Sequence, residues 1–420
     1  MRARVLAAAT VVALLAAGAP VPAAGTPPAP GAAVPCPRLP APKVTRPPRP
    51  TPPAPVPEQQ VVGGAALAAA GLVTPPGSAP PPAVTATTWL VADLDSGAVL
   101  GACGPHRYGT PASTQKLLLA ATLLNRLDPK QVAVATRDDL DIEPGSSAVG
   151  LLVGGRYQVE TLWLGLLLQS GNDAANMLAR LGAGSARAGV AEMNAEARRL
   201  GALQTHAVTP SGLDGPGQFT SAYDLALIAR ACFADPRFGR YALTERAQIP
   251  AQPALKKSGF QIQNENQLIY RYPGALGGKT GFTELARHSY VGAAQRGGRR
   301  LVVTLLGAEA RPVRGWQQGA QLLDWGFALP RDASVGNLVT PGELDAVEDE
   351  PAREAPVATP TARTEPAPWR GPGGTALRRM ADGDWQIIVP AAGLLALAVG
   401  AAAVLAARRG RSRRNGRRRA

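Results

Sequence analysis

Proline disfavours both helices and central strands, and its uneven distribution divides this 420-residue chain into parts of very different folding capacity. Residues 25–84 and 332–385 are rich in proline, and the second segment also carries an acidic run. Such segments favour extended polyproline geometry and cannot build a hydrophobic core. We therefore expect both to be spacers, and residues 85–331 to form the folded domain.

The two ends of the chain carry patterns of export and membrane insertion. Residues 1–24 combine a basic start, a short apolar run and small residues, which predicts a secretory signal peptide cleaved near Ala23 or Ala24. The alternative for this segment is a retained membrane anchor, which the shortness of the apolar run disfavours. Residues 386–407 form an uncharged apolar stretch long enough to cross a bilayer as one helix.

Eight arginines follow that stretch in residues 408–420. The positive-inside rule places such a tail in the cytoplasm and the rest of the chain outside. We thus predict a single-pass protein of the cell membrane with an extracellular folded domain. Eight of the charges behind the net charge of +14 belong to this tail, so the basic composition does not indicate a nucleic-acid partner.

The central region has alternating strand-like and helix-like patterns. Two short apolar runs, 89–93 and 98–101, are separated by a turn sequence and predict a hairpin. Apolar strands are predicted at 290–294 and 301–306. Helices are predicted after Ser113, through 117–124, and at 160–168, 176–181, 190–200 and 316–325. This order favours an α+β fold with an antiparallel sheet and helices on both faces.

Three short motifs occur in order within the central region: Ser113-Thr-Gln-Lys116, Ser170-Gly-Asn172 and Lys279-Thr-Gly281. The whole chain has only six lysines, and Lys116 alone has a serine three residues before it. Serine is a weak nucleophile that needs an adjacent base. Lys116 lies on the same helical face and can act as that base if burial or a second cation, such as Lys279, lowers its pKa.

The motifs and their surroundings resemble serine D-alanyl-D-alanine carboxypeptidases of the S11 family, the low-molecular-weight penicillin-binding proteins, and actinobacterial members in particular. The resemblance covers residues 85–331. It is carried by the segments 111–116, 166–175, 210–215 with 220–224, and 272–283. It implies the penicillin-binding-protein and β-lactamase-like transpeptidase fold, joined here to one C-terminal transmembrane helix in place of the family's frequent C-terminal β-domain.

The resemblance also implies the substrate and the residue roles. Peptidoglycan stem peptides ending in D-Ala-D-Ala are the expected substrates, and β-lactams the expected covalent inhibitors. We predict neither a metal ion nor a cofactor. The implied roles are nucleophile for Ser113, base for Lys116, proton relay for Ser170, amide contact for Asn172, carboxylate binding for Lys279 and Thr280, close approach at Gly281, and oxyanion binding by the backbone N–H groups of Ser113 and Phe282. Arg311 and Arg314 are candidates for a further carboxylate-binding arginine.

Two other functions share parts of this pattern. A β-lactamase carries the same three motifs, but class A enzymes need a deacylating glutamate, and residues 204–214 contain none. A non-catalytic cell-wall-binding module on proline-rich arms would need no nucleophile. The cysteines leave one question open, because Cys103 and Cys232 either pair in the oxidising compartment or remain separate thiols, while Cys36 lies in the proline-rich segment.

Overall fold

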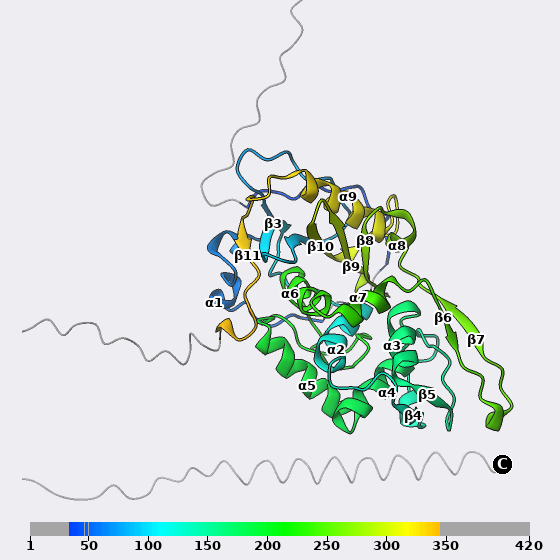
Figure 1. The fold of residues 1–420 in the computed structure, drawn as a ribbon. Coiled ribbons are helices and arrows are strands. Elements are labelled where there is room, and N and C mark those ends of the chain that lie inside the picture. The colour runs from blue at the N-terminus through cyan, green and yellow to red at the C-terminus, as the bar shows by residue number, and fades with distance from the viewer. Residues whose placement is uncertain (1–32, 46, 49, 345–420) are drawn as a thin grey trace, which may run out of the picture. The chain divides into compact units, whose positions relative to one another are not determined.

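The computed structural model describes residues 33–45, 47–48 and 50–344 (Figure 1). The predicted signal peptide, the apolar stretch 386–407 and the arginine-rich tail lie outside these residues. Within the described part of the chain, no helix is both long and apolar enough to cross a membrane.

An antiparallel sheet forms the centre of the domain. Its strands are β1 (Leu72–Val73), β2 (Thr88–Asp93), β3 (Ala98–Cys103), β8 (Ala275–Thr283), β9 (Arg287–Arg296), β10 (Arg299–Ala308) and β11 (Gly336–Asn337). Their order across the sheet is β1-β3-β2-β10-β9-β8, and β11 also pairs with β3. The β2–β3 hairpin and the strands β9 and β10 confirm the sequence prediction, and the last two are longer than predicted.

Helices make up most of the remaining structure. They are α1 (Pro57–Gln60), α2 (Lys116–Leu123), α3 (Val159–Leu168), α4 (Asn172–Ala183), α5 (Ala186–Arg199), α6 (Ala222–Phe233), α7 (Pro236–Leu243), α8 (Leu268–Arg271) and α9 (Gly315–Ala328). Short 3₁₀ turns are η1 (Ala65–Ala68), η2 (Ala112–Gln115), η3 (Asp138–Leu140) and η4 (Pro253–Leu255). Two small hairpins pair β4 (Val132–Val134) with β5 (Arg156–Gln158) and β6 (Arg246–Ile249) with β7 (Phe260–Gln263).

Both faces of the sheet are buried, as the sequence predicted. Along β2, Trp89 and Val91 pack in one apolar cluster, whereas Leu90 and Ala92 pack in another. This division follows from the alternation of side chains along a strand. The first cluster includes α9, and the second includes α2 and α6, so the two layers of helices lie on opposite sides of the sheet (Figure 1).

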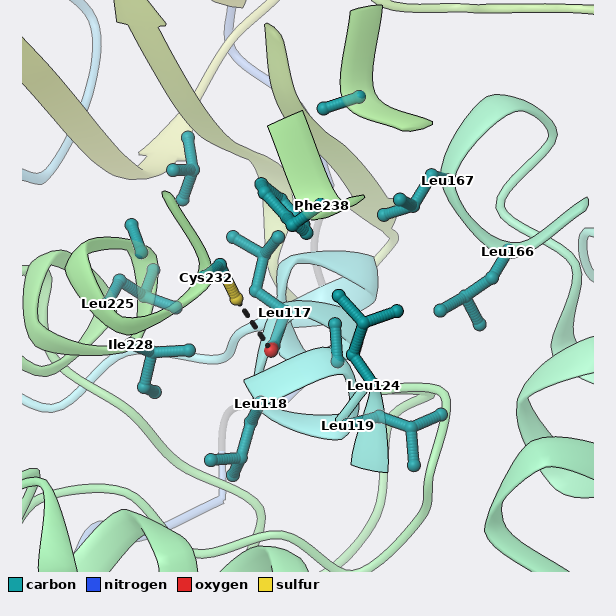
Figure 2. Close-up of a cluster of buried hydrophobic side chains, with 14 of the residues drawn as sticks. Leu117, Leu118, Leu119, Leu124, Leu166, Leu167, Leu225, Ile228, Cys232 and Phe238 are labelled. Atoms are coloured by element: carbon teal, nitrogen blue, oxygen red, sulfur yellow. Dashed lines mark hydrogen bonds between the residues drawn. The ribbon is translucent and has the colours of Figure 1, made fainter. Parts of the chain in front are cut away.

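The helix α2 runs through the interior of the helical layer (Figure 2). Its leucines Leu117, Leu118 and Leu119 have no exposed surface, and Phe238 of α7 belongs to the same apolar cluster. A helix buried on every side cannot shift without opening cavities, and each large-to-small change in such a core costs about 2–5 kcal/mol. The residues just before α2 are therefore held by a rigid support.

The folded domain extends beyond both predicted boundaries. Within the expected spacer 25–84, β1 joins the edge of the sheet and Leu67 is fully buried in the core. After residue 331, β11 pairs with β3, and Leu338 and Val339 are buried. The reason is local composition, because residues 58–74 and 331–340 contain no proline although they adjoin proline-rich stretches.

The cysteine pairing also differs from the alternatives considered from sequence. Cys103, on β3, forms a disulfide with Cys36, in the proline-rich segment. Cys232 is a buried free thiol, and it donates a hydrogen bond to the Leu117 carbonyl oxygen at 3.2 Å (Figure 2). Because 67 residues separate Cys36 from Cys103, sequence spacing offered no reason to pair them.

Candidate active site

Ser113 lies in the 3₁₀ turn η2, between the sheet and the helical layer. We expected Ser113 to open the α-helix itself, but α2 begins at Lys116. The residue before the serine, Ala112, has a φ of 48°, a conformation that costs free energy for a residue with a side chain. The hydroxyl of Ser289, on β9, donates a 2.6 Å hydrogen bond to the Pro111 carbonyl and fixes this turn to the sheet.

Lys116 is fully buried directly beneath Ser113. Its Nζ lies 2.8 Å from the Ser113 Oγ, 2.7 Å from the Asn172 Oδ1 and 2.9 Å from the Ser211 carbonyl oxygen. Burial lowers the pKa of Lys116 well below its usual value, and repulsion by the charge of Lys279 lowers it further. A lysine with a depressed pKa is neutral more often at neutral pH, and it can then accept a proton from the serine hydroxyl.

Lys279 lies on β8 and is also almost completely buried. Its Nζ donates a hydrogen bond to the Thr280 carbonyl oxygen at 2.6 Å. Burial lowers its pKa to about 8, while the negative charge of Glu265 partly opposes that effect. Lys279 therefore carries a positive charge on most molecules at pH 7, which is the state that attracts a carboxylate.

The second motif comes from the end of α3 and the start of α4. Asn172 begins α4, and its side chain accepts the hydrogen bond from Lys116. Ser170 has a φ of 59° and is 4% exposed. Its hydroxyl forms no hydrogen bond with either lysine or with any other described residue. Ser170 thus lines the same cavity as Ser113, as the predicted proton relay requires, but no hydrogen-bonded path through its hydroxyl is preformed.

The strand β8 closes the other side of the site. A first side-chain carbon at Gly281 would lie 2.3 Å from the Ser289 hydroxyl and 2.9 Å from the backbone nitrogen of Ser113. Glycine is therefore required for the close approach of β8 to η2, in addition to any approach of a substrate. Thr280 and Phe282 face the cavity on either side of this glycine, and the Phe282 side chain is half exposed.

Asp173 supports the site without lining it, and we assigned no role to this residue from the sequence. Its carboxylate accepts hydrogen bonds from the backbone N–H groups of Val149, Gly150 and Leu151 at 2.8–3.0 Å. These bonds fix residues 149–151 against the start of α4, next to the second motif. An aspartate beside a catalytic motif gives a weak sequence signal, because its partners are backbone groups that any residue supplies.

A second supporting frame holds the carbonyl of Ser211 in place. Gln115, next to Lys116 in sequence, donates hydrogen bonds to the Thr209 carbonyl at 2.8 Å and to the Gln218 side chain at 3.0 Å. The Gln218 side chain in turn accepts bonds from the backbone of Thr209 at 3.2 Å. The segment 209–218 is thereby fixed against the turn that carries the serine.

These groups open into a cavity of about 1000 Å³. Its lining includes Ser113, Ser170, Asn172, Thr280, Gly281 and Phe282, while Lys116 and Lys279 lie beneath it. Arg311 and Arg314, the candidate carboxylate-binding arginines, are exposed and do not line this cavity. Among the described residues, no cluster of three or more His, Cys, Asp or Glu side chains could hold a metal ion.

Comparison with known proteins identifies what this arrangement is similar to. Residues 76–310 match the peptidase S11 family model, described as D-alanyl-D-alanine carboxypeptidase. D-alanyl-D-alanine carboxypeptidase DacB2 of Mycobacterium tuberculosis is 48% identical over 272 residues, which cover 63% of this chain and 90% of the relative. DacD of Salmonella typhimurium is 35% identical over 59% of this chain, and the match spans 64% of its length.

Solved structures give the same result. The crystal structure of D-alanyl-D-alanine carboxypeptidase from M. tuberculosis has a TM-score of 0.60 at 47% identity, covering 63% of this chain and all of that chain. The Streptomyces K15 DD-transpeptidase has a TM-score of 0.57 at 25% identity, covering 60% of this chain and all of that chain. The fold is therefore the penicillin-binding-protein and transpeptidase fold that the motifs predicted.

Proposed function

Because this chain belongs to the peptidase S11 family of D-alanyl-D-alanine carboxypeptidases, we propose that it removes the terminal D-alanine from peptidoglycan stem peptides through an acyl-enzyme on Ser113. The observation that carries this proposal is the 2.8 Å contact between the Ser113 Oγ and the Nζ of a fully buried lysine. A serine paired in this way with a lysine of depressed pKa is equipped to attack an amide carbonyl.

In the first step, neutral Lys116 takes the hydroxyl proton of Ser113 while the Oγ bonds to the carbonyl carbon between the two D-alanines. The carbonyl oxygen becomes an oxyanion. Backbone N–H groups of Ser113 and Phe282 would stabilise that charge, since preformed donors of this kind commonly contribute about 10²–10³-fold in rate. The C–N bond then breaks, and the departing amine of D-alanine receives the proton by way of Lys116 and Ser170.

Lys279 has a different part in this scheme. Its ammonium group and the Thr280 hydroxyl would bind the terminal carboxylate of the substrate, which selects peptides with a free C-terminus. Asn172 serves two partners, since its side-chain oxygen holds Lys116 and its amide NH₂ can donate to the peptide backbone of the substrate. Water then hydrolyses the ester on Ser113 and releases the shortened peptide.

The same chemistry accounts for penicillin binding. A β-lactam places a strained amide carbonyl and a carboxylate in the same cavity, so Ser113 would form an ester with it. The ester is expected to persist, because residues 204–214 contain no glutamate of the kind that activates a deacylating water in class A β-lactamases.

The location of the enzyme is a further part of the proposal. A signal peptide at 1–24, a membrane helix at 386–407 and a cytoplasmic tail at 408–420 would hold the domain outside the cell on a proline-rich spacer. The support is the uncharged apolar stretch followed by eight arginines. Truncation before Gln386 should release a soluble and active enzyme, and an active truncated protein that stays in the membrane fraction would contradict the single-span arrangement.

Labelling with a fluorescent penicillin tests the catalytic proposal. Wild-type protein should gain one covalent adduct, which peptide mapping locates on Ser113, and it should release one D-alanine from a purified pentapeptide. Ser113→Ala should abolish both results. Ser96→Ala, which changes an exposed turn between β2 and β3, is the matched control and should retain both. An adduct that survives Ser113→Ala would overturn the assignment.

A further inference from the structure

The catalytic cavity has an unusual distribution of charge for a chain with a net charge of +14. Four carboxylate side chains line the cavity: Glu143, Asp214, Glu265 and Glu284. Among its described lining residues there is no lysine or arginine, because both active-site lysines are buried beneath the surface. A substrate thus meets negative charge first and reaches the positive charge of Lys279 only at the bottom of the cavity.

Glu265 occupies the best-supported position among the four. The residues on either side, Asn264 and Asn266, are buried, and the Asn264 side chain donates 3.1 Å hydrogen bonds to the carbonyls of Ala242 and Thr244. The backbone N–H of Glu265 donates to the Leu168 carbonyl at 3.1 Å. This frame fixes the glutamate beside the end of α3, two residues from Ser170.

The Glu265 carboxylate itself has no protein partner. It forms no hydrogen bond and no salt bridge with any described residue, and its side chain is exposed to the cavity. Asp214, in contrast, accepts a 2.8 Å hydrogen bond from the Thr283 hydroxyl. The charge of Glu265 nevertheless reaches the catalytic groups, since it raises the pKa values of both Lys116 and Lys279 against the effect of burial.

A second lining residue is also without a partner. Ser170 is 4% exposed, and its hydroxyl has no hydrogen-bond partner among residues 33–344 that the structure describes. The Ser170 hydroxyl and the Glu265 carboxylate thus both line the cavity with their polar atoms available to a ligand. A ligand that binds both groups would form a hydrogen bond with the Ser170 hydroxyl and place a positive charge next to the Glu265 carboxylate.

We propose that Glu265 is a specificity-determining residue, which pairs with an ammonium group on the peptide substrate. This inference rests on the proposed carboxypeptidase function and names the group of the stem peptide that the enzyme recognises. Peptides with a free side-chain amine next to D-Ala-D-Ala are preferred over peptides in which that amine is acylated. A cross-link through the amine removes its charge, so the enzyme acts preferentially on uncross-linked stems.

Two synthetic peptides test this proposal. They are Nα-acetyl-L-Lys-D-Ala-D-Ala and the same peptide acetylated at Nε, and the measured quantity is the ratio of their kcat/KM values. The wild-type enzyme should prefer the free amine by about fivefold, the upper range for a partly exposed ion pair. Glu265→Gln should bring the ratio close to one. Glu245→Gln, which changes an exposed carboxylate outside the cavity lining, should keep the wild-type ratio.

Each other result has a distinct meaning. A preference that persists in Glu265→Gln overturns the proposal, as does an equal loss of preference in Glu284→Gln, which would assign the effect to the whole acidic rim. Equal slowing of both peptides by Glu265→Gln would show that the residue acts on the lysines or on water, not on the amine. Hydrolysis of the Nε-acetylated peptide by the wild-type enzyme checks the proposed function separately. Cleavage of neither peptide would overturn both the proposed function and this inference.

Discussion

The two buried lysines of the cavity differ in how completely the protein holds them. Lys116 has three hydrogen-bond acceptors from three separate segments of chain, namely Ser113, Asn172 and Ser211. Lys279 has one, the carbonyl of the next residue in its own strand. Three acceptors fix the position of an amine completely, whereas a single acceptor leaves two donors available to a ligand.

This difference indicates a division of labour. A base must be held at one distance from the serine, since small displacements reduce proton transfer strongly. A group that binds a carboxylate must instead retain unused donors and a positive charge. The pKa values agree with this assignment. Burial and the charge of Lys279 both lower the pKa of Lys116, which favours the neutral form that a base needs. Lys279 has a pKa of about 8, so it keeps its positive charge at pH 7.

Outside the two lysines themselves, the largest expected effect comes from the contact between the two halves of the site. Gly281→Ala would place a methyl group 2.9 Å from the Ser113 nitrogen, so β8 must move away from η2. We expect the rate of penicillin acylation to fall by about 100-fold, the cost of a displacement near 1 Å. Stopped-flow measurement of acylation checks this value. Gly239→Ala, where a methyl group would meet nothing within 4 Å, is the control and should acylate at the wild-type rate.

A smaller effect is expected from loosening the base. Asn172→Ala removes one of the three acceptors of Lys116, and a hydrogen bond to such a group is worth roughly 1.5–3 kcal/mol. Acylation by penicillin should slow by about 20-fold. Asn176→Ala, one turn further along α4, leaves Lys116 untouched and serves as the control. Equal rates for Asn172→Ala and wild type would mean that Asn172 does not position the base.

The smallest of these effects concerns pH and Lys279. With a pKa of about 8, its positive charge is present below pH 8 and is lost as the pH rises above that value. Binding of a substrate carboxylate should therefore weaken by about tenfold between pH 7 and pH 9. A pH profile of kcat/KM for the pentapeptide measures this change. Lys279→Arg should remove it, because arginine keeps its charge, and a profile unaffected by that substitution would assign the change to another group.

Residue identity and spacing predicted much of the site in advance. The three-residue interval between Ser113 and Lys116 led us to expect their contact, and the order of the motifs led us to expect two lysines in one site. The main strands and the helices on both faces of the sheet also followed from apolar periodicity.

The missed features share a physical cause. The Ser211 carbonyl that holds Lys116, and the backbone groups that bind Asp173, are main-chain atoms and leave no trace in residue type. The left-handed conformations of Ala112 and Ser170 are imposed by tertiary packing and not by local preference. The edge strand β1 was hidden by its proline-rich neighbours, and its disulfide depends on a spatial closeness that spacing does not reveal.

Acylation rates of two charge-preserving variants test the division of labour most directly. Pre-steady-state acylation of Lys116→Arg and Lys279→Arg by penicillin would be measured side by side, with circular dichroism to verify folding. Arginine keeps the positive charge but does not lose its proton. Lys116→Arg should therefore lose about 10²–10⁴-fold in rate, the usual contribution of a general base, while Lys279→Arg should lose much less. Equal losses, or a larger loss in Lys279→Arg, would contradict the assignment.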